Sequence, residues 1–122
     1  MKISEFQSYL NTIFPVSLQE EYDNSGLQVG DPQETINGIL ITVDLTEAII
    51  DEAIEKKANF ILSHHPLIFS GLKKIATENF VERAIRKAIQ NNIAIYSAHT
   101  NLDKHKEGIN IKLAEKLGLK NI

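Results

Sequence analysis

The sequence contains no cysteine, and this absence removes several classes of site at once. Disulfides, thiolate nucleophiles and every cysteine-based zinc or iron–sulfur site are excluded. Histidine, aspartate and glutamate are therefore the strong metal ligands that the chain can offer. The lack of cysteine also fits a reducing compartment, and we expect the protein to be cytoplasmic.

Long apolar runs are missing as well. The aliphatic run over residues 39–41 is short, and the first six residues mix charged with apolar side chains. A membrane-spanning helix needs about 20 apolar residues, and a secretory peptide needs an apolar block. We therefore predict no membrane segment.

An excess of basic residues is also lacking. Thirteen Lys and Arg stand against sixteen Asp and Glu, which gives a net charge of -3. Nucleic acid is therefore not expected as a partner, because proteins that bind it neutralise its phosphates with Lys and Arg. A glycine-rich phosphate loop of the GxxxxGK type is absent too.

What is present is the pattern of one globular domain, with 43% hydrophobic and 24% charged residues over 122 positions. Short apolar runs alternate with amphipathic segments, which predicts an α/β fold with a mainly parallel sheet of three or more strands and helices packed on it. We assign residues 1–122 to a single domain. The first three expected helices follow a capping box at Ser4, Thr46 and Thr77, and a last helix carries Ile109, Leu113 and Leu117 and is ended by Gly118. The expected strands are 39–43 (a buried strand), 60–62 and 93–96, and residues 22–32 are expected to form a loop.

Residues that can bind metal follow each of the three expected strands. Asp44 follows the first strand, His64 and His65 the second, and His99 and Asp103 the third. Right-handed crossovers bring the C-terminal ends of parallel strands to one edge of a sheet, which is where α/β proteins bind ligands. We therefore predict a metal site at this edge.

The chemistry of these residues favours hydrolysis at a divalent metal. His64 and His65 are adjacent on extended backbone before Pro66, so they can point to different sides and serve two ions, with Asp103 facing them. Imidazole and carboxylate suit Zn, Fe, Mn, Co and Ni alike.

Each candidate residue also has a simpler interpretation. His99 fits a buried, hydrogen-bonded histidine as well as a functional one, and Asp103 fits a turn or helix-terminus residue. Asp44 fits a cap of the helix after Thr46, which we favour, or a hydrogen-bond partner of a histidine. His105 lies among charged residues and is expected on the surface.

Several blocks of the sequence resemble the NIF-three-like dinuclear metal-centre family, whose members are labelled GTP cyclohydrolase I type 2 homologues. The blocks are in the family's order and cover nearly the whole chain: 22–30, 44–46, 63–69, 97–103 and 117–119. The resemblance implies that His64, His65 and Asp103 bind metal, with two ions per site in full-length relatives, and that His99 lies close by and assists catalysis or orients a ligand. It places Asp23 and Asn24 in a loop near the same cleft, in a structural or supporting role.

The resemblance also implies a homo-oligomer and a small-molecule nucleotide substrate. In the family, a C-terminal part supplies a further His-x-x-x-Glu pair of ligands. Residues 1–122 do not include that part. We therefore expect an incomplete dinuclear centre that resembles the N-terminal half of the family's site. The two hypotheses are a metal-dependent hydrolase, which we favour, and a non-catalytic metal-binding scaffold or interaction protein.

Overall fold

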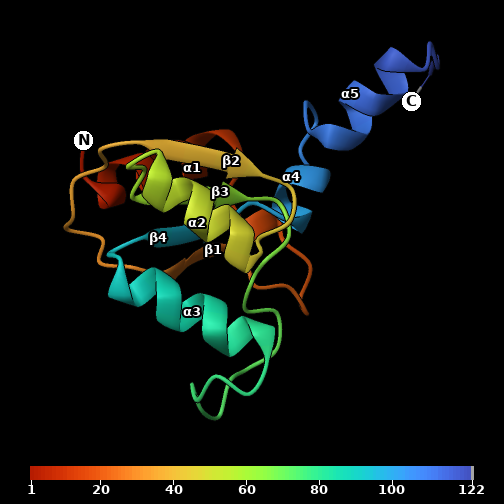
Figure 1. Cartoon of the computed structure of the whole chain (residues 1–122). Helices are drawn as coiled ribbons and strands as arrows, with labels where there is room; N and C mark the ends of the chain where they lie inside the picture. Colours follow the sequence, from red (N-terminus) through yellow and green to blue (C-terminus); the bar gives the residue numbers. More distant parts are fainter. Residues whose placement is uncertain (122) are drawn as a thin grey trace.

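The computed structural model describes residues 1–121, and its helices and strands alternate along most of the chain (Figure 1). A short 3-10 helix, η1, follows the first α-helix. In chain order the elements are α1 (Ile3–Ile13), η1 (Val16–Leu18), β1 (Gly26–Val29), β2 (Ile39–Thr42), α2 (Glu47–Glu55), β3 (Phe60–Ser63), α3 (Phe80–Gln90), β4 (Ala94–Ser97), α4 (Thr100–Asp103) and α5 (Ile109–Lys116).

The four strands form one sheet in the order β1-β4-β3-β2. β2 pairs with β3, and β3 with β4, in parallel, as the alternation of strands and helices predicts. β1 pairs with β4 in the antiparallel direction. The sheet is therefore mixed: two of its three pairings are parallel, in agreement with the expected mainly parallel sheet, and β1 adds an antiparallel edge strand that the sequence interpretation did not include.

Helices cover both faces of the sheet. α2 and α3 pack on one face, where Ile50 and Ile85 join Ile61 and Ile95 in an apolar cluster (Figure 1). α1 packs on the opposite face, where a second cluster includes Leu10 and Tyr96. Burial of these side chains fixes the strands, and thereby the loops that follow them.

β1 lies inside the segment that we predicted as a loop. The strand is bounded by glycines with positive φ, +113° at Gly26 and +122° at Gly30. A Cβ atom at Gly30 would lie 2.6 Å from the Cβ of Ala94, so the close approach of β1 to β4 requires glycine at this position. Glycine and aspartate, which typically mark turns, here mark the ends of a short edge strand.

β2 is an edge strand rather than the buried strand we predicted. Leu40 is buried, whereas Ile41 on the opposite face is 74% exposed. Neighbouring side chains of a strand point to opposite faces, so the apolar run alone cannot distinguish a central strand from an edge strand.

The helix starts agree with the sequence prediction in part. Thr46 caps α2 as expected, with its hydroxyl accepting a hydrogen bond from the Ile49 N–H. α1 begins at Ile3, before the predicted capping box at Ser4, and the Glu5 carboxylate accepts a 2.7 Å hydrogen bond from the Lys2 N–H. α3 begins after Asn79 rather than next to Thr77.

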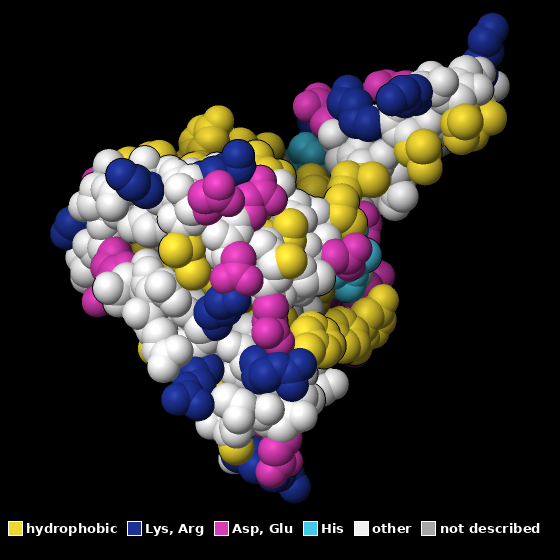
Figure 2. Space-filling view, viewed as in Figure 1, with side chains coloured by type: hydrophobic (Ala, Val, Ile, Leu, Met, Phe, Trp, Pro, Cys, Tyr) yellow, Lys and Arg dark blue, Asp and Glu magenta, His cyan; other side chains and the backbone are white. Residues whose placement is uncertain are grey.

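α5 extends away from the body of the domain (Figure 1). Its apolar stripe, Leu113 and the following Leu117, is more than half exposed, and Figure 2 shows hydrophobic side chains along one side of this helix. Among residues 1–121, no helix has both the length and the apolar character needed to cross a bilayer. Ile122 lies outside the described residues.

Candidate metal centre

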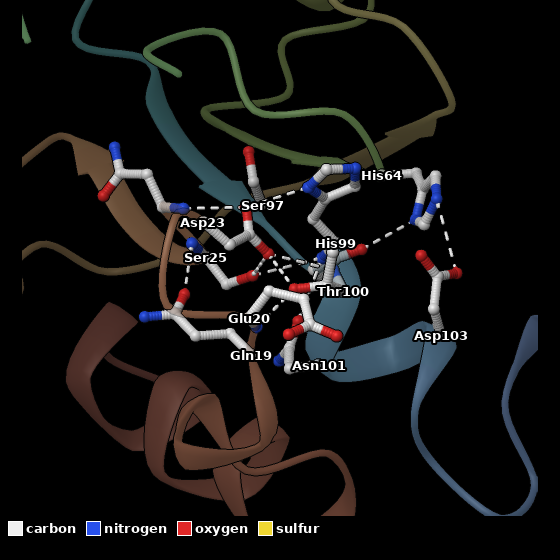
Figure 3. A network of polar contacts seen from close by, with 12 residues as sticks. Gln19, Glu20, Asp23, Ser25, His64, Ser97, His99, Thr100, Asn101 and Asp103 are labelled. Atoms are coloured by element: carbon white, nitrogen blue, oxygen red, sulfur yellow. Dashed lines mark hydrogen bonds and ion pairs between the residues drawn. The ribbon is translucent and has the colours of Figure 1, made fainter. Parts of the chain in front are cut away.

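The C-terminal edge of the parallel strands collects the candidate residues. His64 and His65 directly follow β3, Asp44 lies just beyond β2, and His99 lies just beyond β4. Because β1 runs antiparallel to β4, its first residue pairs with the last residue of β4, and the loop before β1 brings Asp23 to the same edge (Figure 3).

Three histidines meet at this edge and form a group able to hold a metal ion. One ring nitrogen each from His64, His65 and His99 lies within 4.8 Å of the others. Two nitrogens that bind the same zinc ion at ~2.0–2.1 Å are at most about 4.2 Å apart, so any longer separation in this group would have to shorten for all three rings to bind one ion.

The Nδ1 atom of every ring in this group faces an oxygen. His64 Nδ1 lies 2.8 Å from the Ala98 carbonyl oxygen, His65 Nδ1 lies 2.7 Å from Asp44 Oδ1, and His99 Nδ1 lies 2.8 Å from Asp23 Oδ1. A carbonyl or carboxylate oxygen only accepts, so each Nδ1 carries the proton. Each Nε2 is left with a lone pair, which is the form of imidazole that binds metal.

Asp103 approaches the group from α4. Its Oδ1 lies 3.7 Å from His64 Nε2, which is too long for a hydrogen bond. Both atoms are acceptors when His64 is protonated on Nδ1. The separation falls within the span of about 4.3 Å that one zinc ion allows between a nitrogen and an oxygen ligand.

Asp23 is the most enclosed of the acidic groups, with a side chain that is 0% exposed. Burial alone would raise the pKa of its carboxyl group. Hydrogen bonds from the Thr100 side chain, from His99 and from the Thr100 and Asn24 backbones outweigh burial and hold that pKa well below its usual range. Asp23 is therefore a permanent anion beneath His99.

The surroundings of the histidines are partly apolar. The side chains of His64 and His99 are 17% and 19% exposed, and that of His65 is 50% exposed. Figure 2 shows a histidine at the surface among acidic side chains, next to hydrophobic ones. An open groove of about 460 Å³ begins at His64 and is lined by Phe14, Ile41, Thr42, Val43, Leu62, Ser63, Ala98, Leu102 and Ile109.

The structure places the predicted residues as follows. His64, His65 and His99 come together, and Asp103 is near His64; their roles as ligands and as a catalytic group stay predictions. Asp44 pairs with His65 and does not cap α2, which corrects the interpretation that we favoured.

Sequence reasoning missed two features of the site. It placed His99 at this edge in a catalytic or orienting role and not among the potential metal ligands, and it did not predict α4, whose four residues begin at Thr100. The Ala98 carbonyl that orients His64 is a backbone group, so no side-chain motif signals it. The convergence of three strand ends was the available signal for His99.

Comparison with known proteins identifies the family. The profile of Duf34/NIF3 (NGG1p interacting factor 3) matches residues 1–122. The chain belongs to the Duf34/NIF3 family. This confirms the resemblance that the sequence blocks indicated.

Curated relatives within this family are longer than the chain. A "GTP cyclohydrolase 1 type 2 homolog" of Staphylococcus epidermidis is 46% identical over 122 residues, which are 100% of this chain and 33% of the relative. One of Clostridium acetobutylicum with the same name is 42% identical over 118 residues, which are 97% of this chain and 44% of the relative. The chain thus spans between a third and a half of these curated relatives.

Solved structures of the family share this fold. Staphylococcus aureus protein SA1388 has a TM-score of 0.93 at 43% identity, over 99% of this chain and 39% of that one. Reduced HcgD from Methanocaldococcus jannaschii has a TM-score of 0.90 at 35% identity, over 99% of this chain and 48% of that one. The α/β architecture is therefore that of the Duf34/NIF3 proteins.

Proposed function

We propose that this chain forms the metal-binding part of a metal-dependent hydrolase. The observation that supports this best is the common orientation of three imidazoles. Each Nδ1 of His64, His65 and His99 faces an oxygen acceptor, so the three Nε2 lone pairs are available at one edge of the sheet. Metal-binding histidines in proteins have this arrangement, with the second nitrogen donating to a carbonyl or carboxylate.

The donor set fits a borderline divalent cation. Imidazole nitrogens and a carboxylate suit zinc, iron, manganese, cobalt or nickel. A divalent cation at this position would supply Lewis acidity that activates water for hydrolysis. The proposed ligands are His64, His65 and Asp103, and the 3.7 Å gap between His64 Nε2 and Asp103 Oδ1 supports a cation between two acceptors.

His99 is proposed to handle the proton of the reaction. Its Nε2 is free to accept a proton, while Asp23 accepts the hydrogen bond from its Nδ1 and stabilises the imidazolium that forms. This pairing of a histidine with a buried carboxylate is the arrangement that orients catalytic bases in hydrolases. A small-molecule nucleotide is the proposed substrate, supported by the curated name "GTP cyclohydrolase 1 type 2 homolog" of the relatives.

Metal binding and turnover on the same purified chain test the proposal. We expect calorimetry with Zn²⁺ to show saturable binding, and expect added Zn²⁺, Mn²⁺ or Fe²⁺ to produce hydrolysis of GTP. His65→Ala should lose both activities, because it removes an Nε2 ligand. His105→Ala is the matched control, because this histidine lies outside the group and its Nδ1 accepts a hydrogen bond from the Glu107 N–H.

Two results would contradict the proposal in different ways. Absence of zinc binding in the wild-type chain would contradict the metal centre itself. Stoichiometric zinc without turnover of GTP or of a phosphodiester would contradict hydrolase activity of this chain and support a non-catalytic metal-binding protein.

A further inference from the structure

The Asp23 carboxylate accepts five hydrogen bonds, from its own loop, from His99 and from the first residue of α4. Its Oδ1 accepts from the Asn24 N–H at 2.7 Å and from His99 Nδ1 at 2.8 Å. Its Oδ2 accepts from the Thr100 N–H at 3.0 Å, from the Thr100 hydroxyl and from the Ser25 hydroxyl at 3.1 Å. One fully buried carboxylate thus joins the loop before β1, the histidine after β4 and the start of α4 (Figure 3).

We propose that Asp23 is the positioning residue of this edge: its Oδ1 fixes the tautomer of His99, and its Oδ2 fixes α4 and thereby Asp103. The inference rests on the proposed function for its catalytic meaning. The structural arrangement that it describes is measurable without any metal or substrate.

The first part concerns the proton on His99. A neutral imidazole carries its proton on either nitrogen, and a partner that only accepts selects the nitrogen facing it. The Asp23 side chain is 0% exposed, so water does not compete with its carboxylate for the hydrogen bond from His99 Nδ1. Nε2 is consequently unprotonated, in a ring whose centroid lies 5.3 Å from that of His64 and 5.6 Å from that of His65.

The second part concerns α4, which has only four residues and little helical stability of its own. Its first residue, Thr100, is held through both its N–H and its hydroxyl by Asp23. Asp103 is its last residue, 3.7 Å from His64 Nε2. A displacement at the start of α4 therefore changes the distance between Asp103 and the histidines.

Asp23→Asn tests the first part, because an amide has the same shape and only one acceptor oxygen. When its oxygen faces Thr100 and Ser25, the amide keeps three of the five donors. The NH₂ group then lies against His99 Nδ1, and the Asn24 N–H loses its acceptor. His99 Nδ1 must then accept, and its proton moves to Nε2. We expect long-range proton–nitrogen correlation spectra of isotope-labelled histidine to show His99 protonated on Nδ1 in the wild type and on Nε2 in the variant.

Asp44→Asn is the matched control for this spectrum. It makes the same chemical change at the carboxylate that faces His65. The Asp44 side chain is 72% exposed. The His99 signals should be unchanged in this variant. A purely structural role of Asp23 would likewise leave the His99 tautomer unchanged in Asp23→Asn.

Asp23→Ala tests the second part, because all the groups that donate hydrogen bonds to the Asp23 carboxylate lose their acceptor. We expect the folded variant to bind Zn²⁺ about 10- to 100-fold more weakly, as is typical when a residue that orients metal ligands is lost. Circular dichroism establishes that the variant is folded, and calorimetry measures the affinity.

Each outcome decides the inference. A wild-type His99 protonated on Nε2, or an Asp23→Asn variant that keeps the proton on Nδ1, overturns the first part even when Asp23→Ala does not fold. Folded Asp23→Ala with wild-type zinc affinity overturns the second. Wild-type protein that binds no zinc contradicts the proposed function, while the spectra still establish whether Asp23 sets the tautomer.

Discussion

The side chains of Asp44 and His65 form a hydrogen bond at the C-terminal edge of the sheet, with 2.7 Å between Oδ1 and Nδ1. The two residues follow neighbouring parallel strands, β2 and β3, which explains why they meet. The helix after Asp44 is capped by Thr46 instead. Asp44 and Thr46, which are two positions apart, therefore have separate roles: Asp44 binds His65, and Thr46 caps α2.

This separation predicts opposite effects of two alanine substitutions. Asp44→Ala should weaken Zn²⁺ binding about tenfold, at the low end of the range for a residue that orients a ligand, because Asp44 is 72% exposed. It should leave the free energy of unfolding within about 0.5 kcal/mol of wild type. Thr46→Ala should cost about 1 kcal/mol of stability by removing the cap, and leave zinc affinity unchanged. Calorimetry and urea unfolding of both variants check the pair, and a loss of stability in Asp44→Ala would contradict it.

Asp103 should contribute directly to metal affinity. Its carboxylate Oδ1 is 3.7 Å from His64 Nε2, a distance that suits a shared cation and not a hydrogen bond. We expect Asp103→Asn to weaken Zn²⁺ binding by about 100-fold or more, exceeding the effect of losing a residue that only orients a ligand. Glu107→Gln, in the following turn and exposed, is the control. Equal calorimetric affinities of wild type and Asp103→Asn would remove Asp103 from the ligand set.

The sequence predicts the central part of this arrangement because local patterns determine it. Short apolar runs that alternate with amphipathic segments indicate β2, β3 and β4, and parallel crossovers bring Asp44, His64 and His99 to one edge. Placing the His64–His65 pair and His99 at the same edge required no long-range information beyond that topology.

The parts that the sequence does not predict depend on contacts between distant backbones. β1 forms because Gly30 lets its chain pass against Ala94, and Asp23 reaches His99 only because β1 is antiparallel. The acceptor for His64 is the carbonyl oxygen of Ala98, which any residue would provide. Such relationships appear only once the strands are placed.

Glu82 on α3 should make stability depend on pH. Its buried carboxylate accepts hydrogen bonds from the N–H groups of Glu78 and Ala76 and from the Asn79 side chain. The Glu78 hydrogen bond is the main cause of the lowered pKa of Glu82; burial opposes it, and the bond from Ala76 and the charge of Lys74 add to it.

A lowered pKa fixes the sign of this dependence. The ionised carboxylate stabilises the fold fully above its ordinary pKa of 4.5, and this contribution is lost as the pH falls below that value toward the lowered one. Glu82→Gln should therefore be less stable than wild type at neutral pH, with a difference that shrinks on acidification below pH 4.5. Urea unfolding across this range measures it. Glu55→Gln, at an exposed position of α2, should show no such narrowing, and a constant difference for Glu82→Gln would contradict the role of its charge.

Gly30 should tolerate alanine less well than Gly26, although both have positive φ. At Gly26 a Cβ atom meets nothing within 4 Å, so Gly26→Ala should cost only backbone strain, about 1–3 kcal/mol. At Gly30 the added atom would lie 2.6 Å from the Cβ and 3.0 Å from the Cα of Ala94, which adds about 1–3 kcal/mol of overpacking. Urea unfolding of the two variants isolates this contact, and equal stabilities would contradict it. Gly30 lies just past the end of β1 that is farther from Asp23, so Gly30→Ala protein that is folded should retain wild-type zinc affinity.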